Sequence, residues 1–478
     1  MQAHRFAAAV LGVPVVLLAL IGIGQFVLLD FPNSADEYVY LYQARTMAAG
    51  RLWNETPISP EVFAFNYIVQ EPLRTFGSFP VGWPLALALM LALHVPAWLV
   101  NPALGVVTLA LVWVLGARLY HPRVGVIAAS LVGLSPFFAF NAASYFSHTF
   151  CGALLLGAAC VAAKDDRGPW WVPVSVGLLV GWAVLARYLT GVVCAVPIVF
   201  WLLRPDVPRV RTVCLLALGG LPWIVVLMAY NAALGGSPWQ LTTTPLTVTR
   251  WFAEGFALRG ADILATHVLR HMLWTPPALF GAYLVYLWAA PRDTRRGGYD
   301  WMLLLMAATL YFYAERGGNQ YGPRFHSEVF PFVVIFVVAN VFREGLFSEK
   351  PWRDRAVFAL LAASVAVAPV GFVAHAVIEH RVVRERMDPY DRVAALGLRQ
   401  ALVLIDGRVG TVRSMAAFDL TRNGLDYLGS VIYGLDPGAG ARCAPGVGVP
   451  GRTTYLYGWN RAGSYGTLRP LECPPRTP

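Results

Sequence analysis

Two adjacent carboxylates, Asp36 and Glu37, lie within the stretch 33–53, directly after the first long apolar run of the chain. They are expected where a membrane helix emerges into water, and an acidic pair at such a place is a candidate for catalytic chemistry. The pattern Ser34-x-x-Glu37 is also that of a capping box, in which Ser34 accepts from the Glu37 amide and Glu37 reaches back to the Ser34 amide. Capping accounts for Glu37 but not for Asp36, although acids are common in a first helical turn because they complement the helix dipole.

Asp36 is expected in the first turn of a helix, with Tyr40 and Ala44 on the same face because residues four apart are neighbours on a helix surface. Capping also leaves the tyrosines at positions 38, 40 and 42 unexplained. The stretch is therefore a candidate active site.

A second segment with chemical potential is Tyr321-Gly322-Pro323-Arg324-Phe325-His326-Ser327-Glu328. An arginine at a membrane boundary is costly unless it is paired, and its planar guanidinium can bind a phosphate through two hydrogen bonds. Arg324 and Tyr321 are therefore candidate phosphate ligands. The alternatives for Arg324 are snorkelling to the interface or an ion pair with Glu328.

Three further features lie on the same expected side of the membrane. His148, in Ser147-His148-Thr149, is a candidate site residue, although a lone histidine there is more often a hydrogen-bonded interfacial residue than a catalyst. Arg187, followed by Tyr188, could meet an anionic headgroup or anchor the interface. The loop 231–271 could stack on a sugar or form an interfacial belt, since it contains Trp239, Arg250, Trp251, Arg259 and Arg270.

The composition predicts an α-helical polytopic membrane protein. The 478 residues are 57% hydrophobic and only 13% charged, with a mean hydropathy of +0.56, which is outside the usual range of soluble globular proteins. The first apolar run, 6–29, lacks a small-residue cleavage site near its end and is expected to be a retained transmembrane helix. The net charge of +10 is assigned to membrane orientation, and nucleic acid is not expected as a partner.

Eleven apolar runs are expected to cross a hydrocarbon core of ~30 Å, with the amino terminus in the cytoplasm and the carboxyl terminus outside. Every basic cluster is cytoplasmic under the positive-inside rule only if a twelfth run, 81–95, does not cross. We therefore expect a membrane-lying helix over 80–95, inside a long outer loop, 30–95. The expected crossings are 6–29, 96–117, 124–142, 149–163, 170–186, 188–203, 213–230, 272–290, 299–314, 329–342 and 356–375.

The tail loses its long apolar runs at about residue 376, which predicts a transmembrane domain over 1–375 and a small extracytoplasmic α/β domain over 376–478. Strand-like pieces at 401–405, 430–433 and 453–457 are separated by Gly, Pro and Asn. Cys443 and Cys473 are the only cysteines outside the apolar runs, and an oxidising outer compartment favours a disulfide between them. The remaining cysteines, 151, 160, 194 and 214, are expected to be small buried hydrophobes.

The pattern Asp36-Glu37-x-x-Tyr40 after a first crossing, the long outer loop, and a later Tyr321-Gly-Pro-Arg324 before an apolar run resemble the GT-C superfamily. Its members are integral-membrane glycosyltransferases that use polyprenyl-phosphate sugars, and the resemblance is greatest to bacterial relatives of the protein O-mannosyltransferases and of the lipid A aminoarabinose transferase. The tail segment 418–424 also resembles one found in their outer domains. The resemblance implies a multi-pass protein of the bacterial inner membrane.

Carried over to this chain, the resemblance implies that Asp36 is the general base, Glu37 its helix-capping neighbour and Arg324 a contact to the donor phosphate. The second outer loop of many relatives offers an acid, and His148 stands at that position here. This departure puts a metal site or second acid taken from those relatives in doubt. No cofactor is assigned, and dependence on a divalent metal is left open.

In the implied reaction, an acceptor hydroxyl loses its proton near Asp36 as it attacks the anomeric carbon of a polyprenyl-phosphate hexose or pentose, and the polyprenyl phosphate departs with inversion. The acceptor would be a glycan, lipid or protein of the cell envelope. Two alternatives stay open. One is a lipid or sugar-lipid flippase, which is disfavoured because no repeated halves are visible. The other is a catalytically inactive binding protein with the same fold.

Overall fold

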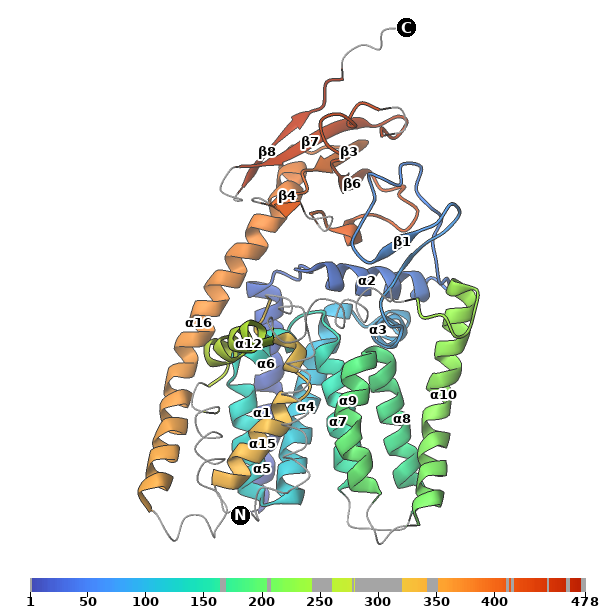
Figure 1. The fold of residues 1–478 in the computed structure, drawn as a ribbon. Coiled ribbons are helices and arrows are strands. Elements are labelled where there is room, and N and C mark those ends of the chain that lie inside the picture. The colour runs from blue at the N-terminus through green and yellow to red at the C-terminus, as the bar shows by residue number, and fades with distance from the viewer. Residues whose placement is uncertain are drawn as a thin grey trace. The chain divides into compact units, whose positions relative to one another are not determined.

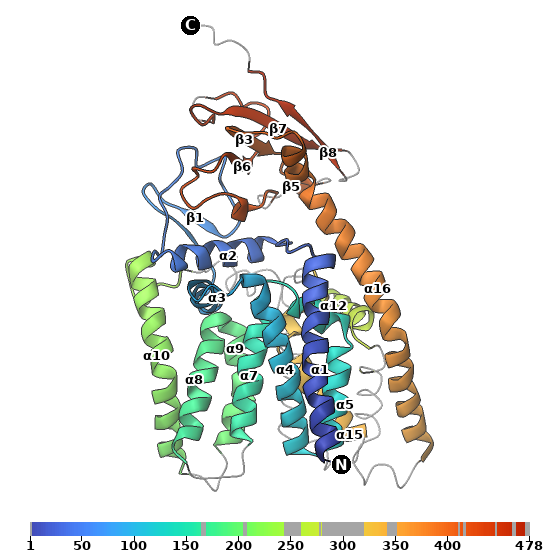
Figure 2. The same ribbon diagram turned by 180° about the vertical axis from the view of Figure 1, so that it is seen from behind.

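A computed structural model divides the chain into two compact units, and Figures 1 and 2 show its ribbon from opposite sides. Unit 1 comprises Met1–Phe26, Pro80–Trp83 and Trp98–Ala376, and unit 2 comprises Val27–Phe79, Pro84–Ala97 and Val377–Pro478. The residues that the structure describes are 2–163, 169–203, 208–242, 260–276, 279, 320–341, 351–409, 412–413, 417–444, 447–460 and 465–473.

Unit 1 is a bundle of apolar helices. Helix α8 packs against α7, α9 and α10, and both ribbon views show these helices side by side. Glycine allows α8 and α10 to approach closely, because a Cβ on Gly177 would lie 2.0 Å from the carbonyl oxygen of Leu216. The helices of unit 1 are α1 (Gln2–Gly22), α4 (Ala97–Leu119), α5 (Pro122–Gly133), α6 (Pro136–Ala142), α7 (His148–Ala162), α8 (Trp171–Ala186), α9 (Tyr188–Leu202), α10 (Arg209–Gly235), α12 (Gly260–Trp274), η3 (Arg324–His326), α15 (Phe330–Val341) and the first part of α16 (Pro351–Ala395).

The seven expected crossings up to 213–230 coincide with helices, as do those at 329–342 and 356–375. The expected crossings 272–290 and 299–314 lie outside the described residues, apart from residues 272–276 and 279. Among the described residues, three helices are each long and apolar enough to cross a membrane, and the bent pair α5 and α6 would make a fourth span. The chain is thus mostly helical, as expected for a polytopic membrane protein.

The bend between α5 and α6 leads the chain toward the candidate site. The two helices meet at 71°, and Pro136 begins α6, where its missing N–H removes no helical hydrogen bond. Every residue of α6 is buried. A short buried segment, residues 143–147, then joins α6 to His148 at the start of α7.

Unit 2 contains a four-stranded sheet in the order β6-β3-β7-β8, visible in Figure 1. The central strand β3 (Ala401–Ile405) pairs in parallel with β6 (Val431–Leu435) and with β7 (Thr453–Trp459), and β8 (Gly466–Pro470) is antiparallel to β7. All five residues of β3 are buried, as expected for a strand covered on both faces. The other elements of unit 2 are α2 (Ala35–Ala48), β1 (Ile68–Gln70), β2 (Thr75–Gly77), most of α3 (Gly82–Ala92), β4 (Arg408–Val409), β5 (Val412–Arg413) and η4 (Leu420–Arg422).

The long loop after the first helix packs against the tail, and both belong to unit 2. From the sequence, this loop was expected to belong to the transmembrane domain. Val62 and Phe63 join the core of the sheet beside Leu402 and Leu404, and the Val62 carbonyl accepts from the amide of Leu435 at 2.7 Å. Burial of these apolar side chains favours this partnership. Its members are far apart in sequence, so no local pattern indicated it.

Helix α3 occupies most of the run that was expected not to cross the membrane. It has 11 residues, and at ~1.5 Å per residue it is about half as long as a ~30 Å hydrocarbon core requires. Its position on the outer leaflet stays a prediction.

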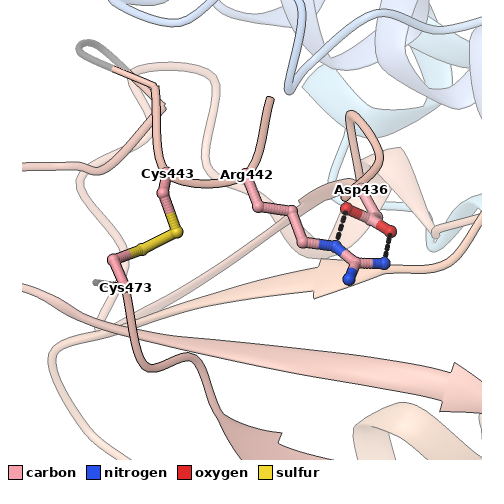
Figure 3. The surroundings of a disulfide bond; sticks show 4 residues. All are labelled: Asp436, Arg442, Cys443 and Cys473. Atoms are coloured by element: carbon pink, nitrogen blue, oxygen red, sulfur yellow. Dashed lines mark hydrogen bonds and ion pairs between the residues drawn. A yellow bond between two sulfur atoms is a disulfide. The ribbon is translucent and has the colours of Figure 1, made fainter. Parts of the chain in front are cut away.

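Cys443 and Cys473 form a disulfide in unit 2, with their Cα atoms 5.6 Å apart (Figure 3). The neighbouring Arg442 binds Asp436 through two hydrogen bonds, Nε to Oδ1 at 2.8 Å and a terminal nitrogen to Oδ2 at 2.6 Å. The loop is thus held by a covalent bond and a bidentate ion pair. Of the other cysteines, 151, 160 and 194 are buried as expected, whereas Cys214 is exposed.

Alkylation of the unfolded protein without reductant should label the four free cysteines and leave Cys443 and Cys473 unlabelled, because only those two are joined. Intact-mass measurement counts the labels, and prior reduction is the matched control that should give six, the number of cysteines in the chain. Six labels without reduction would contradict the disulfide.

Candidate functional site

The two adjacent acids at the start of α2 have different surroundings. Ser34 Oγ accepts from the Glu37 amide at 3.2 Å, as the capping box predicts, but Glu37 Oε2 accepts from the amide of Asn33 at 2.9 Å, one residue before the expected one. Arg386 holds Asn33 in turn, through its carbonyl oxygen and, at 3.0 Å, through Oδ1. Glu37 is only 1% exposed, so its carboxylate is committed to the cap.

Asp36 is half-buried at the first turn of α2. Tyr40 and Ala44, which share its helix face, are buried. Of the two acids, Asp36 is the more exposed residue.

The three tyrosines of α2 are buried packing residues. Tyr38 makes edge contacts with Phe31 and Phe65 at centroid distances of 6.1 and 5.7 Å, and burial raises the pKa of its phenol. Tyr42 is held through its hydroxyl, which accepts from Asn54 Nδ2 at 3.0 Å. These rings fix the orientation of α2 and with it the direction of Asp36.

The tail segment 418–424 also supports α2. Asp419 accepts from the amide and the hydroxyl of Thr421 at 2.8 and 2.6 Å, and it forms an ion pair with Arg422. Burial raises the pKa of Asp419, against the opposing effect of these hydrogen bonds. Arg45 of α2 donates to the Thr421 carbonyl, so the segment acts as a brace for the helix that carries the acidic pair.

In unit 1, a sharp turn places Arg324. Tyr321 and Gly322 have φ values of 60° and 88°, in the region that favours glycine. A Cβ on Gly322 would lie 3.0 Å from atoms of both Phe137 and Trp274. The turn leads into η3, where Arg324 is only 7% exposed and its guanidinium carbon lies 4.2 Å from the centre of the Phe146 ring.

Tyr321 packs beneath this turn. Its ring lies 5.9 Å from that of Phe140 and 5.8 Å from that of Phe146, and its carbonyl accepts from Asn141 Nδ2 at 3.1 Å. The side chain is fully buried. Tyr321 therefore supports the same Phe146 ring on which Arg324 rests.

Glu328 brings together two residues that the sequence suggested separately. Its Oε1 lies 3.0 Å from His148 Nδ1 and 2.9 Å from Arg187 Nε, and Arg187 donates to Ser147 Oγ at 3.1 Å. Glu328 is 0% and His148 1% exposed. Burial raises the pKa of the Glu328 carboxyl, whereas Arg187 lowers it. We name these residues, Glu328, His148 and Arg187, the carboxylate cluster.

The role of Glu328 in this cluster was missed by sequence reasoning, which considered it only as a partner of Arg324. The sequence shows only that an acid follows Arg324 by four residues at the edge of an apolar run. That spacing does not indicate His148 as the partner of Glu328, because the two residues are 180 positions apart.

The loop 231–271 contributes little that can be placed. Trp239 is 81% exposed and Arg270 is half-buried, whereas Arg250, Trp251 and Arg259 lie outside the described residues. Within the described part of the chain, no three His, Cys, Asp or Glu side chains are grouped so that they could hold a metal ion. His148 is instead bound to Glu328, so we derive no step through a metal.

Comparison with known proteins finds one matching family model and several solved structures of similar fold. Residues 78–230 match the family model described as dolichyl-phosphate-mannose-protein mannosyltransferase. The fold matches the crystal structure of ArnT from Cupriavidus metallidurans bound to undecaprenyl phosphate with a TM-score of 0.61 and 12% identity, over 96% of this chain and 93% of that one. The apo structure of the same protein matches with a TM-score of 0.55 and 13% identity, over 95% and 93% of the two chains. No curated protein matches in sequence.

The expected resemblance to the GT-C superfamily is thus supported by a family model over less than half of the chain and by a shared fold. The chain is a multi-pass membrane protein, and its fold is that of the matched ArnT structures. At such low identity the solved structures show the fold alone, and the roles of single residues rest on the geometry described above.

The capping geometry yields a test of Glu37. Glu37→Ala leaves the buried Asn33 amide without its acceptor and should lower the free energy of unfolding by about 1–3 kcal/mol. Glu37→Gln is the matched control, because its amide oxygen can still accept from Asn33, and it should stay close to wild type. Thermal unfolding in detergent measures both, and equal midpoints for Glu37→Ala and wild type would contradict the cap.

Proposed function

We propose that the chain is a membrane glycosyltransferase that moves a sugar from a polyprenyl-phosphate donor to an acceptor hydroxyl outside the cytoplasm. The observation that carries this proposal is the buried Arg324 guanidinium stacked on Phe146, in a fold shared with a protein crystallised with undecaprenyl phosphate. A buried arginine suits an anionic ligand, because its planar fork can bind a phosphate bidentately.

Arg324 is assigned as the main contact to the donor phosphate. Its charge stabilises the phosphate that departs when the bond to the anomeric carbon breaks, and fixed charge in a water-poor site is worth more than in bulk water. Arg187 adds positive potential nearby, reduced by its ion pair with Glu328. We assign Tyr321 a supporting role, since its buried ring packs under Arg324 through Phe146.

Asp36 is assigned as the general base. It takes the proton of the acceptor hydroxyl while the hydroxyl oxygen attacks the anomeric carbon, so the product has inverted configuration. The contrast with Glu37 supports this choice, because Glu37 is buried and bound to the Asn33 amide whereas Asp36 is half-buried. A base in this role contributes typically ~10²–10⁴-fold to the rate.

The proposed setting is the inner membrane, with about eleven crossings, a cytoplasmic amino terminus and the α/β part of unit 2 outside. In that orientation the donor lipid lies in the bilayer and the acceptor is a glycan, lipid or protein of the cell envelope. The transferred sugar would be a hexose or a pentose.

Asp36→Asn keeps the size of the side chain and most of its hydrogen bonding but removes the proton acceptor. It should lower kcat by ~10²–10⁴-fold and leave KM for the donor nearly unchanged. Initial rates with a panel of radiolabelled undecaprenyl-phosphate hexoses and pentoses, using membrane glycolipid extracts as acceptors, measure the effect.

Glu37→Gln is the matched control for Asp36→Asn, and it should retain most of the activity because it can still complete the cap. If Asp36→Asn is fully active while Glu37→Gln is dead, the roles of the two acids are reversed. If the protein moves labelled lipid across vesicles without transferring sugar, the flippase alternative is favoured instead.

Arg324→Lys keeps the charge and loses the planar fork. We expect a higher KM for the donor together with a lower kcat, since both the bound phosphate and the departing phosphate lose a bidentate contact. Displacement of a fluorescent polyprenyl phosphate should show weaker binding of undecaprenyl phosphate. Unchanged affinity and turnover would exclude Arg324 as the phosphate ligand.

A further inference from the structure

The contact between Glu328 and His148 bears on which nitrogen of the imidazole carries the proton. Arg187 lies 2.9 Å from the same carboxylate oxygen, and this ion pair favours the ionised form of Glu328. An ionised carboxylate only accepts hydrogen bonds. With Glu328 ionised, the contact at 3.0 Å is a hydrogen bond that His148 donates from Nδ1 to Glu328.

The same surroundings keep His148 neutral. Its side chain is 1% exposed, and burial disfavours the charged imidazolium. Arg187 and Arg324 add positive charge close by, since the Arg187 guanidinium shares Glu328 with His148 and the Arg324 guanidinium shares Phe146 with it. A neutral imidazole with its proton on Nδ1 carries a lone pair on Nε2.

His148 and the proposed phosphate ligand flank one ring. The centre of the Phe146 ring lies 5.8 Å from the His148 ring and 4.2 Å from the Arg324 guanidinium carbon. Phe325 contacts the same two groups, 6.0 Å from the His148 ring and 5.4 Å from that guanidinium carbon. His148 and Arg324 therefore contact the same two aromatic rings, Phe146 and Phe325.

We propose that Glu328 and His148 form a carboxylate–imidazole dyad in which Nε2 of His148 accepts a hydrogen bond from a hydroxyl of the donor sugar. The inference rests on the proposed glycosyltransferase function and deepens it. His148 is the residue that contacts the sugar, and Glu328 is a positioning residue that fixes the tautomer and orientation of the ring. Fixing a ring through the opposite nitrogen is also how proteins orient metal-binding and catalytic histidines.

Two substitutions separate the two nitrogens of the ring. In His148→Asn the side-chain amide nitrogen takes the place of Nδ1, so the bond to Glu328 is kept and the acceptor at Nε2 is lost. In His148→Gln the longer side chain can place its amide oxygen near Nε2, so an acceptor is kept and the bond to Glu328 is lost. The two variants therefore test sugar contact and packing separately.

We expect His148→Asn to unfold at the wild-type temperature and to lose about tenfold in kcat/KM, the size of one hydrogen bond of about 1.4 kcal/mol. His148→Gln should unfold at a lower temperature and retain more of kcat/KM than His148→Asn. Donors lacking single hydroxyl groups identify the partner, because one such donor should be used equally well by wild type and His148→Asn.

The outcomes distinguish the dyad from the function on which it rests. If wild type transfers no sugar from any donor in the panel, both proposals fall. If wild type transfers sugar and His148→Asn does so with unchanged kcat/KM, the glycosyltransferase stands and the dyad is overturned. If only His148→Gln is impaired, His148 serves packing alone, and the sugar contact is likewise overturned.

Discussion

The arrangement in unit 1 depends on the pairing of one buried charge. Glu328 is fully buried, and removing a carboxylate from water costs several kcal/mol unless its charge is compensated and its oxygens are hydrogen-bonded. Arg187 and His148 both meet Oε1, where the Arg187 guanidinium supplies the compensating charge and His148 a hydrogen-bonding contact. They come from the start of α7 and from the turn between α8 and α9, while Glu328 precedes α15. A single carboxylate therefore ties three separate parts of the chain together, and the position of Arg324 four residues earlier is set by the same segment.

The two adjacent acids of α2 show how local geometry assigns different chemistry to similar residues. Glu37, at the third helical position, points back toward the preceding chain and satisfies the Asn33 amide. Asp36, one residue earlier, lies about 100° around the helix axis and is only half-buried. The cap depends on tail residues as well, since Arg386 holds Asn33 and Arg45 of α2 reaches the Thr421 carbonyl. The acidic pair is thus positioned by unit 2 as a whole and not by the helix alone.

Local patterns in the sequence predicted the features that are themselves local. Apolar runs located the helices, the Ser34-x-x-Glu37 spacing predicted the Ser34 cap, and the position of Cys443 and Cys473 outside those runs indicated the bridge that the structure contains. Features built from distant segments were not predicted, because spacing carries no information about which element will pack on which. The insertion of Val62 and Phe63 into the core of the tail sheet is of this kind, as is the partnership of Glu328 with His148. The tyrosines of α2 looked unusual in sequence because their partners, Phe31, Phe65 and Phe79, belong to neighbouring segments of unit 2.

The charges of Glu328 and Arg187 also explain why a histidine, His148, suits the place where many relatives have an acid. An acid at position 148 would place two carboxylates within hydrogen-bonding distance of one another in a buried site, and like charges so close cannot both stay ionised. One of them would be protonated, or Arg187 would have to divide its charge between the two. An imidazole avoids this conflict, because a neutral ring protonated on Nδ1 can donate to Glu328 while its other nitrogen remains an acceptor. With Glu328 supplying the negative charge from another part of the chain, a neutral residue that can both donate and accept is the one that position 148 can accommodate.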